Sequence, residues 1–321
     1  MSELLKVENL HVTFHTYAGE VKAVRGVSFS LDKGEVLAIV GESGCGKTVT
    51  SKAIMRLLDR TSGEIDKESV IELFGKNMVT LPKRELNKIR GKEISMIFQD
   101  SMTSLNPTMT IGKQIMENIL VHEKVGKREA KKRALELLKL VEIPNAEERL
   151  NNYPHQMSGG MRQRAMIAVA LACNPKVLIA DEPTTALDVT IQAQVLEIIR
   201  SLIRENEMSM ILITHDLGVV AETCDQVAIM YAGEVVEYGS VWDVYTNPKH
   251  PYTRGLFDSI PKMDVDDERL SPIPGLAPNS TALPSGCYFH PRCKYCQERC
   301  REQSPAMKGD THQYKCWLDF E

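Results

Sequence analysis

The chain has no long uninterrupted apolar run. Nowhere do its 321 residues offer the roughly 18 consecutive apolar side chains that a membrane-spanning helix needs. Residues 1–10 mix charged and apolar side chains and contain no apolar block of signal-peptide length. We therefore expect the chain to stay in the cytoplasm and to reach any membrane by docking on a separate membrane-spanning protein.

A surplus of basic residues is missing as well. Lys and Arg number 39 against 43 Asp and Glu, which gives a formal net charge of −4. Because binding to nucleic-acid phosphates normally needs a basic surface, this balance argues against nucleic acid as a partner. Internal repeats and low-complexity tracts are also absent, and a composition of 43% hydrophobic and 26% charged residues supports an ordinary packed core.

What is present is a pattern of strands alternating with helices. Short apolar runs at residues 36–40, 177–180 and 210–214 predict strands buried on both faces. A helical pattern at about 190–204 joins the last two, which predicts a parallel sheet in an α/β fold. Further strands are expected at 7–14, 21–31 and 94–99, and a helical insertion at about 110–150.

A glycine-rich loop follows the first buried strand. Residues 41–48 read Gly-Glu-Ser-Gly-Cys-Gly-Lys-Thr, and a helical pattern follows over 47–58. In such a loop, backbone N–H groups and the positive end of the next helix point at phosphate oxygens. Lys47 is expected to reach the β- and γ-phosphates and Thr48 to bind Mg²⁺. The rest of the predicted cradle is Ser43, Gly44, Cys45 and Gly46.

Cys45 allows two interpretations. It lies at the start of a helix, a place where the pKa of a thiol is usually lowered by the helix dipole, so its oxidation or alkylation would block nucleotide binding. The alternative is that Cys45 is a small filler whose backbone alone matters.

An acidic pair ends another buried strand. Residues 177–182 read Val-Leu-Ile-Ala-Asp-Glu, which delivers Asp181 to support Mg²⁺ and Glu182 to polarise the attacking water. His215 follows the strand at 210–214. In isolation it would be a capping or partly buried histidine. Placed after the acidic pair, it is expected to contact the γ-phosphate and to hold Glu182 and the water.

Residues 158–163, Ser-Gly-Gly-Met-Arg-Gln, begin a further helix and so another anion-binding helix start. With this motif the chain resembles the ATP-binding-cassette ATPases. The resemblance implies that Ser158 and Gly160 contact the γ-phosphate of an ATP held by a second subunit. Met161 and Met157 stand where Gln and Leu are usual, which is tolerable because the phosphate contacts fall on Ser158 and backbone N–H groups.

The other motifs of that family follow in order over residues 4–255. The resemblance implies that Gln99 senses Mg²⁺ and contacts the membrane subunits, and that residues 186–188, Ala-Leu-Asp, lie at the dimer interface. An aromatic side chain is expected to stack on adenine. Phe14 fits the spacing best and Tyr17 is the second candidate, with a core position as the alternative for either.

Two stretches resemble the ATPases of dipeptide and oligopeptide importers. They are residues 98–107, Phe-Gln-Asp-Ser-Met-Thr-Ser-Leu-Asn-Pro, and residues 247–253, Asn-Pro-Lys-His-Pro-Tyr-Thr, which open an extension that continues through residues 286–293, Gly-Cys-Tyr-Phe-His-Pro-Arg-Cys. The resemblance implies an ATP-hydrolysing subunit at the cytoplasmic face of the membrane. Its implied partners are transmembrane permease subunits, a second homologous ATPase (identical or distinct) and, indirectly, an extracytoplasmic substrate-binding protein.

Three alternatives to peptide import remain open at this point. Nickel importers share the same segments. A soluble cassette ATPase acting on DNA or ribosomes is disfavoured by the single cassette and the net charge. In a redox-sensing module, the cysteines would be the function and the ATPase an effector.

The fold implied by the resemblance is a P-loop NTPase nucleotide-binding domain. It comprises a RecA-like parallel sheet core, an antiparallel β subdomain and a helical subdomain, and it is followed by a cysteine-rich extension. We expect the cassette at residues 1–255, its helical subdomain at about 105–165, and the extension at 256–321.

Cysteines crowd the last tenth of the chain. The five residues there are Cys287, Cys293, Cys296, Cys300 and Cys316. In a reducing compartment such a cluster favours a metal site over disulfides, and the spacing suits Zn²⁺ or a [4Fe–4S] cluster. The resemblance favours [4Fe–4S] bound by Cys287, Cys293, Cys300 and Cys316, with Cys296 as a competing ligand through its C-x-x-C spacing. The default role of the cluster is to stabilise a short extension that has little core of its own.

Overall fold

The computed structural model describes residues 3–17, 19–58, 63–184, 189–259 and 272–320, and the chain divides into two compact units. Unit 1 comprises residues 1–3, 31–36 and 80–213. Unit 2 comprises residues 4–30, 37–79 and 214–321. Among the described residues, none of the helices combines the length and the apolarity needed to cross a membrane.

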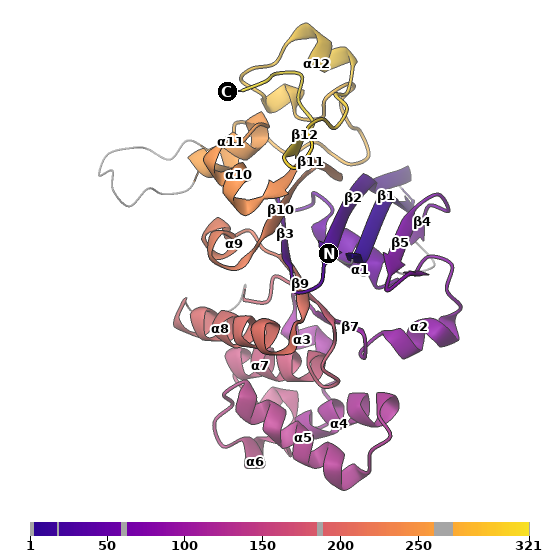
Figure 1. Ribbon diagram of the computed structural model, residues 1–321, viewed down its shortest axis with the longest axis vertical. Helices are drawn as coiled ribbons and strands as arrows, with labels where there is room; N and C mark the ends of the chain where they lie inside the picture. Colours follow the sequence, from indigo (N-terminus) through magenta and orange to yellow (C-terminus); the bar gives the residue numbers. More distant parts are fainter. Residues whose placement is uncertain (1–2, 18, 59–62, 185–188, 260–271, 321) are drawn as a thin grey trace. The chain divides into compact units, whose positions relative to one another are not determined.

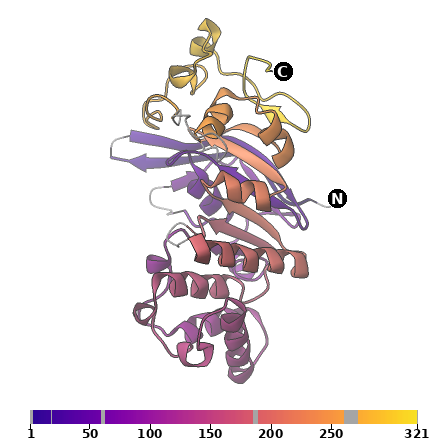
Figure 2. The same ribbon diagram turned by 90° about the vertical axis from the view of Figure 1, so that its left-hand side faces the viewer.

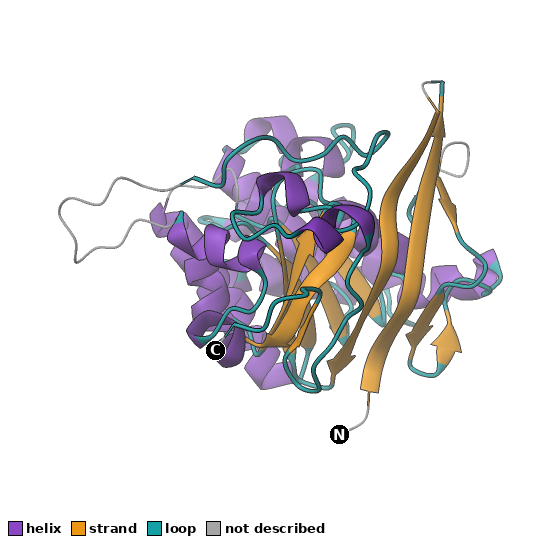
Figure 3. Cartoon of the chain, turned by 90° about the horizontal axis from the view of Figure 1, so that it is seen from above, coloured by secondary structure: helices purple, strands orange, loops and turns teal. Residues whose placement is uncertain are grey.

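Unit 2 contains an antiparallel sheet built on two long strands, β1 (Glu3–Thr16) and β2 (Gly19–Asp32), which run side by side in Figure 3. β1 also pairs with β4 (Gly63–Ile65) and β5 (Val70–Leu73), and β5 pairs with β6 (Lys76–Asn77). Asn9, with φ of +48°, interrupts the alternation of β1. The buried positions therefore shift from Leu5 and Val7 to Leu10 and Val12, so both ends of the long strand cover the core.

A second group of strands in unit 2 carries the glycine-rich loop. β3 (Val36–Val40) is parallel to β10 (Gln226–Tyr231), which pairs antiparallel with β11 (Glu234–Ser240). β12 (Gln313–Tyr314), from the end of the chain, pairs with β11. Every residue of β3 is buried, which is why its sequence is continuously apolar.

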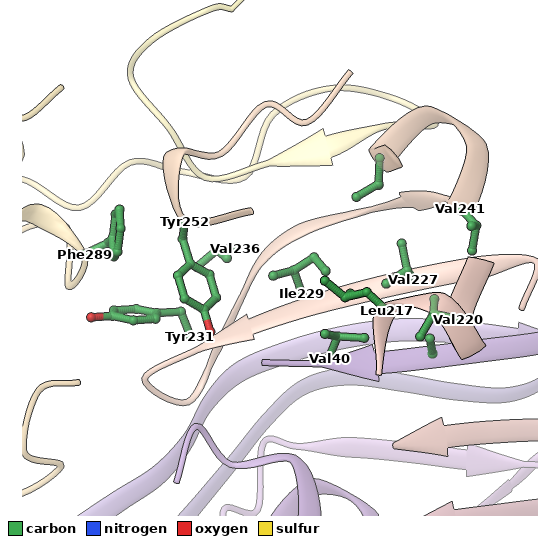
Figure 4. Close-up of a cluster of buried hydrophobic side chains, with 12 residues drawn as sticks. Val40, Leu217, Val220, Val227, Ile229, Tyr231, Val236, Val241, Tyr252 and Phe289 are labelled. Carbon is green, nitrogen blue, oxygen red and sulfur yellow. The ribbon is translucent and has the colours of Figure 1, made fainter. Parts of the chain in front are cut away.

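The helices of unit 2 are short. They are α1 (Lys47–Ile54), α9 (Leu217–Thr223), α10 (Val241–Thr246), α11 (Pro251–Asp258) and α12 (Glu298–Glu302), with a 3₁₀ turn at His290–Arg292. Val40, Val227 and Ile229 of the strands share a buried cluster with Tyr252 and Phe289 of the C-terminal part (Figure 4). The last third of the chain therefore packs on the same core as the strand that precedes the glycine-rich loop.

Unit 1 combines three parallel strands with a group of helices. β7 (Ile94–Ile97), β8 (Val177–Asp181) and β9 (Ser209–Ile213) are fully buried and pair in that order. The helices are α2 (Lys83–Ile89), α3 (Ser101–Ser104), α4 (Ile111–His122), α5 (Lys127–Leu140), α6 (Ala146–Arg149), α7 (Gly159–Ala170) and α8 (Val189–Asn206). In both side views α4, α5 and α6 lie together (Figure 1, Figure 2).

The predicted elements hold with some changes. The strand at 36–40 is confirmed, and those at 177–180 and 210–214 are confirmed to within one residue. The helix predicted over 47–58 ends at Ile54. The insertion at 110–150 is three helices, of which α4 and α5 each have a buried stripe, such as Ile111, Ile115 and Ile119 on α4. The predicted boundaries of cassette and extension stay a prediction.

Candidate functional site

The glycine-rich loop of unit 2 runs from the end of β3 into α1. Gly46 is the N-cap of α1 with φ of +102°, and a Cβ there would lie 2.6 Å from the carbonyl oxygen of Ala23. A Cβ on Gly41 would lie 2.2 Å from the carbonyl oxygen of Met230. Only glycine fits at these two points, so the backbone can curl closely against its neighbours. This is the form in which successive N–H groups can bind an anion.

Lys47 is folded back into this loop. Its side chain is buried, and Nζ donates to the carbonyl oxygens of Gly41 at 2.6 Å and Glu42 at 3.0 Å. Ser43 and Gly44 are exposed at the tip of the loop, Cys45 and Gly46 are buried, and Thr48 is half-buried. The loop carbonyls therefore accept hydrogen bonds from its own lysine, while the residues at its tip are accessible to a ligand.

Cys45 does not have the lowered pKa that its place at a helix start suggested. The side chain is only 5% exposed, and burial raises the pKa of the thiol more than nearby Lys47 lowers it. The expected lowering of this pKa is therefore wrong, because removal from water outweighs the lysine. That oxidation or alkylation of Cys45 blocks nucleotide binding stays a prediction.

The acidic pair of unit 1 lies at the end of β8. Asp181 is 1% exposed, while Glu182 has φ of +48° and donates its backbone N–H to Ile213 at 2.9 Å. Gln99, two residues after β7, donates through Nε2 to Glu182 Oε2 at 2.8 Å. The structure thus joins two side chains that the sequence assigned to separate motifs.

Ser158 begins α7 as its N-cap. Its Oγ accepts from the backbone N–H of Met161 at 3.4 Å, and Ser158 and Gly159 are exposed. Sequence reasoning missed a contact in the same motif. The buried Gln163 donates through Nε2 to the carbonyl oxygen of Pro183 at 2.5 Å, next to Glu182. The sequence signal for this contact was a polar side chain, Gln163, among the apolar residues of the predicted helix.

The remaining predicted residues occupy separate places. His215 is exposed in unit 2, just after β9, and precedes Asp216, whose carboxylate caps α9. Phe14 is half-buried on β1, whereas Tyr17 is fully exposed in the turn that follows. Residues 186–188 lie outside the described residues.

Four cysteines of unit 2 line one pocket. They are Cys287, Cys293, Cys300 and Cys316. Cys296 is not part of the lining, and its Sγ lies 3.5 Å from the carbonyl oxygen of Gln297. A backbone hydrogen bond joins the segments that carry Cys287 and Cys300, because Cys287 donates its N–H to the carbonyl oxygen of Cys300 at 2.8 Å.

These thiols have the chemistry of soft ligands and form no disulfide among themselves. Burial raises the pKa of both Cys287 and Cys293 to about 11, so each carries its proton until a ligand displaces it. Over the part of the chain that the structure describes, no three or more Cys, His, Asp or Glu side chains are placed to hold a single metal ion. The described residues therefore give no support of their own to zinc or to an iron–sulfur cluster, although four thiolates suit either ligand.

Sequence reasoning also missed how the C-terminal part contacts the glycine-rich loop. Arg292 donates through Nη1 to Glu42 Oε2 at 2.6 Å and through Nη2 to Glu42 Oε1 at 2.9 Å. Tyr252 accepts the backbone N–H of Glu42 at its hydroxyl, at 2.9 Å. An acidic residue inside a phosphate-binding loop was the signal that a cationic partner was needed.

Two family models match the chain. The model described as ABC transporter matches residues 24–185, which include the glycine-rich loop, the signature motif and the acidic pair. The model described as oligopeptide/dipeptide transporter, C-terminal region, matches residues 236–300.

Curated relatives match over nearly the whole chain. The oligopeptide transport ATP-binding protein OppD of Bacillus subtilis is 54% identical over 321 residues, covering 99% of this chain and 89% of the relative. The dipeptide transport ATP-binding protein DppD of the same organism is 52% identical, covering 99% and 95%.

Among solved structures, the ATP-binding cassette MJ0796, in a dimer bound to ADP and phosphate, is similar with a TM-score of 0.67 and 28% identity. The likeness covers 74% of this chain and 98% of that cassette. The fold is therefore that of an ABC ATPase cassette. Together with the family models and the full-length relatives, this places the chain in the family of ATP-binding subunits of oligopeptide and dipeptide ABC transporters.

Proposed function

We propose that this chain hydrolyses ATP to drive the import of dipeptides or oligopeptides through a membrane permease. The observation that carries the proposal is that a phosphate-binding loop with its buried lysine and a peptide-transporter C-terminal region occur in one chain. The relatives named as oligopeptide and dipeptide transport ATP-binding proteins support the same class of substrate.

The phosphate loop binds the triphosphate. The backbone of Ser43, Gly44, Cys45 and Gly46 surrounds the β-phosphate, and Lys47 exchanges its bonds to the loop carbonyls for phosphate oxygens. Thr48, Gln99 and Asp181 would hold Mg²⁺, which would neutralise negative charge on the triphosphate. Phe14 or Tyr17 stacks on adenine. The full exposure of Tyr17 leaves its ring accessible for stacking on a base.

Glu182 is the general base that orients the attacking water. Its hydrogen bond from Gln99 supports this role, because the amide keeps the carboxylate in one orientation. His215 contacts the γ-phosphate and steadies Glu182 and the water. Ser158 and Gly160 serve the ATP of a second subunit, and the exposure of Ser158 and Gly159 at the start of α7 supports this role.

The subunit works at the cytoplasmic face of the membrane within a larger assembly. Two ATPase subunits, identical or homologous, close around two ATP molecules and act on transmembrane permease subunits through the region near Gln99. An extracytoplasmic binding protein supplies the peptide. The ADP- and phosphate-bound dimer of the similar cassette supports this arrangement.

We also propose that Cys287, Cys293, Cys300 and Cys316 bind a [4Fe–4S] cluster. The support is that these four thiols line one pocket and Cys296 does not. The cluster would join three short segments of the extension to one another. Absorption spectra with iron, sulfide and zinc analysis of anaerobically purified protein test this, and zinc without iron would contradict it.

Hydrolysis is tested by Glu182→Gln in the purified full chain. This variant should bind MgATP like the wild type while turnover falls by about 10²-fold or more, because the general base is lost. Turnover near that of the wild type would show that Glu182 is not the base. The lesion should also trap a nucleotide-bound dimer, visible by size-exclusion chromatography.

The substrate class needs a separate experiment. The complex purified from its native membrane would be reconstituted in vesicles, and uptake of a labelled dipeptide, a labelled pentapeptide and Ni²⁺ compared. ATP-dependent uptake of Ni²⁺ alone would support the nickel alternative and contradict peptide import.

A further inference from the structure

Arg292 is held on several sides in the C-terminal extension. It ends the 3₁₀ turn His290–Arg292, directly before Cys293, and its side chain is only 5% exposed. Both terminal nitrogens reach the two carboxylate oxygens of Glu42, and Nε donates to the carbonyl oxygen of Pro274 at 2.9 Å. The guanidinium of Arg292 is charged at any physiological pH. A guanidinium that forms a bidentate pair fixes the orientation of the carboxylate, which a lysine does not.

Glu42 is the second residue of the phosphate loop. Its carbonyl oxygen accepts from Lys47 Nζ at 3.0 Å, the same ammonium group that is expected to meet the triphosphate. A carboxylate in this loop without a cationic partner would repel a triphosphate bound there, because like charges near a protein surface repel one another. The structure turns this carboxylate to Arg292 and so neutralises it.

A cluster of aromatic rings supports the same contact. Tyr231, Tyr252 and Phe289 are buried, with ring centroids 4.6 Å apart for Tyr231 and Tyr252 and 5.2 Å apart for Tyr231 and Phe289 (Figure 4). Arg292 lies 5.8 Å from the centre of the Tyr231 ring, and the Tyr252 hydroxyl accepts the backbone N–H of Glu42. The extension is therefore joined to both the side chain and the backbone of Glu42.

We propose that Arg292 is a positioning residue for nucleotide binding. Its guanidinium holds the Glu42 carboxylate against the extension, so that the phosphate loop meets the triphosphate without that negative charge. The inference rests on the proposed function, because it requires the loop to bind ATP.

The test measures the Kd of MgATP by calorimetry on the purified full chain at low salt. Arg292→Gln should raise Kd by about tenfold, because it releases the carboxylate of Glu42. Adding Glu42→Gln to that variant should recover most of the affinity, since it removes the repelling charge. The deficit of Arg292→Gln should also shrink at high salt, where the repulsion is screened. KM for ATP should rise while kcat stays within about threefold, because the reacting groups are untouched.

Arg254→Gln is the matched control. Arg254 also donates through Nε to a backbone carbonyl, that of Pro248 at 2.7 Å, and it stacks on Phe320, but it belongs to no contact with the loop. This variant should bind MgATP with the wild-type Kd.

A wild-type Kd for Arg292→Gln would overturn the inference. So would a deficit that Glu42→Gln does not relieve, because that result indicates a purely structural role. Should Arg292→Gln not fold, Arg292→Lys decides instead. This variant keeps the positive charge but loses the bidentate hydrogen bonding to Glu42. Kd should therefore rise about threefold and recover when Glu42→Gln is added. An unchanged Kd would overturn the inference. Failure of the wild-type chain to bind MgATP would contradict the proposed function itself.

Discussion

The phosphate loop and the cysteine pocket lie in the same unit but are built in different ways. The loop is fixed by its own backbone, with Gly41 and Gly46 pressed against neighbouring carbonyls and Lys47 bonded inside the loop. The pocket takes its walls from short segments, among them the five-residue α12, and its buried thiols keep their protons. The loop is therefore held by bonds within its own backbone, whereas the pocket would gain stability from the proposed cluster.

The largest effect should come from the loop. Lys47→Ala should lower kcat/KM for ATP hydrolysis by roughly 10²–10³-fold, the usual cost of losing one charged donor in the transition state. If the loop is organised without its ligand, the same variant should keep the wild-type iron content and melting temperature. Unchanged turnover would show that Lys47 has no part in the mechanism. A loss of iron would show that the loop and the pocket are not organised independently.

A smaller effect is expected from the pocket. Cys300→Ser should abolish the cluster and speed proteolysis of the extension by about tenfold or more, because the pocket loses the ligand that joins its segments. Limited trypsin digestion under anaerobic conditions measures this. Cys296→Ser is the control, because Cys296 does not line the pocket, and it should digest like the wild type. Equal sensitivity of both variants would contradict the assignment of ligands.

The smallest effect concerns the buried His250 beside the pocket. Burial lowers its pKa to about 4, with Glu237 opposing the shift and Lys315 adding to it. The unfolded chain therefore binds more protons between pH 6.5 and pH 4, so stability is complete above pH 6.5 and falls as the pH drops, by about 1.4 kcal/mol per unit. Denaturant unfolding at pH 7 and pH 5 measures this. His250→Asn keeps a cap for α11 and should flatten the dependence; an equally steep dependence would exclude His250 as its source.

Local signals in the sequence were enough for much of the fold and for locating the contiguous motifs of the candidate site. β3 and β8 are buried on both faces, so their apolar runs identify them, and the loop at 41–48 is a contiguous motif with fixed spacing. The three helices within 110–150 were predicted as one insertion, although Gly126 and Pro144 lie in the breaks between them and were the available signals. The domain boundaries and the roles of individual site residues stay predictions.

The contacts that could not be predicted join distant residues or depend on burial. Gln99 and Glu182 are 83 residues apart, and Glu42 and Arg292 are 250 apart, so neither pair has a spacing that a motif would show. The pKa of Cys45 depends on how deeply the thiol is buried. The expectation that a thiol at a helix start has a lowered pKa takes no account of burial.

The short strand β12 has a consequence for how this subunit behaves outside its assembly. Through Gln313 and Tyr314 the end of the chain pairs with Tyr238 and Glu237 of β11, and so covers the outer edge of that strand. An uncovered edge strand offers free N–H and C=O groups to any other strand and invites aggregation. A chain shortened before residue 313 would therefore be prone to self-association even with its nucleotide site intact.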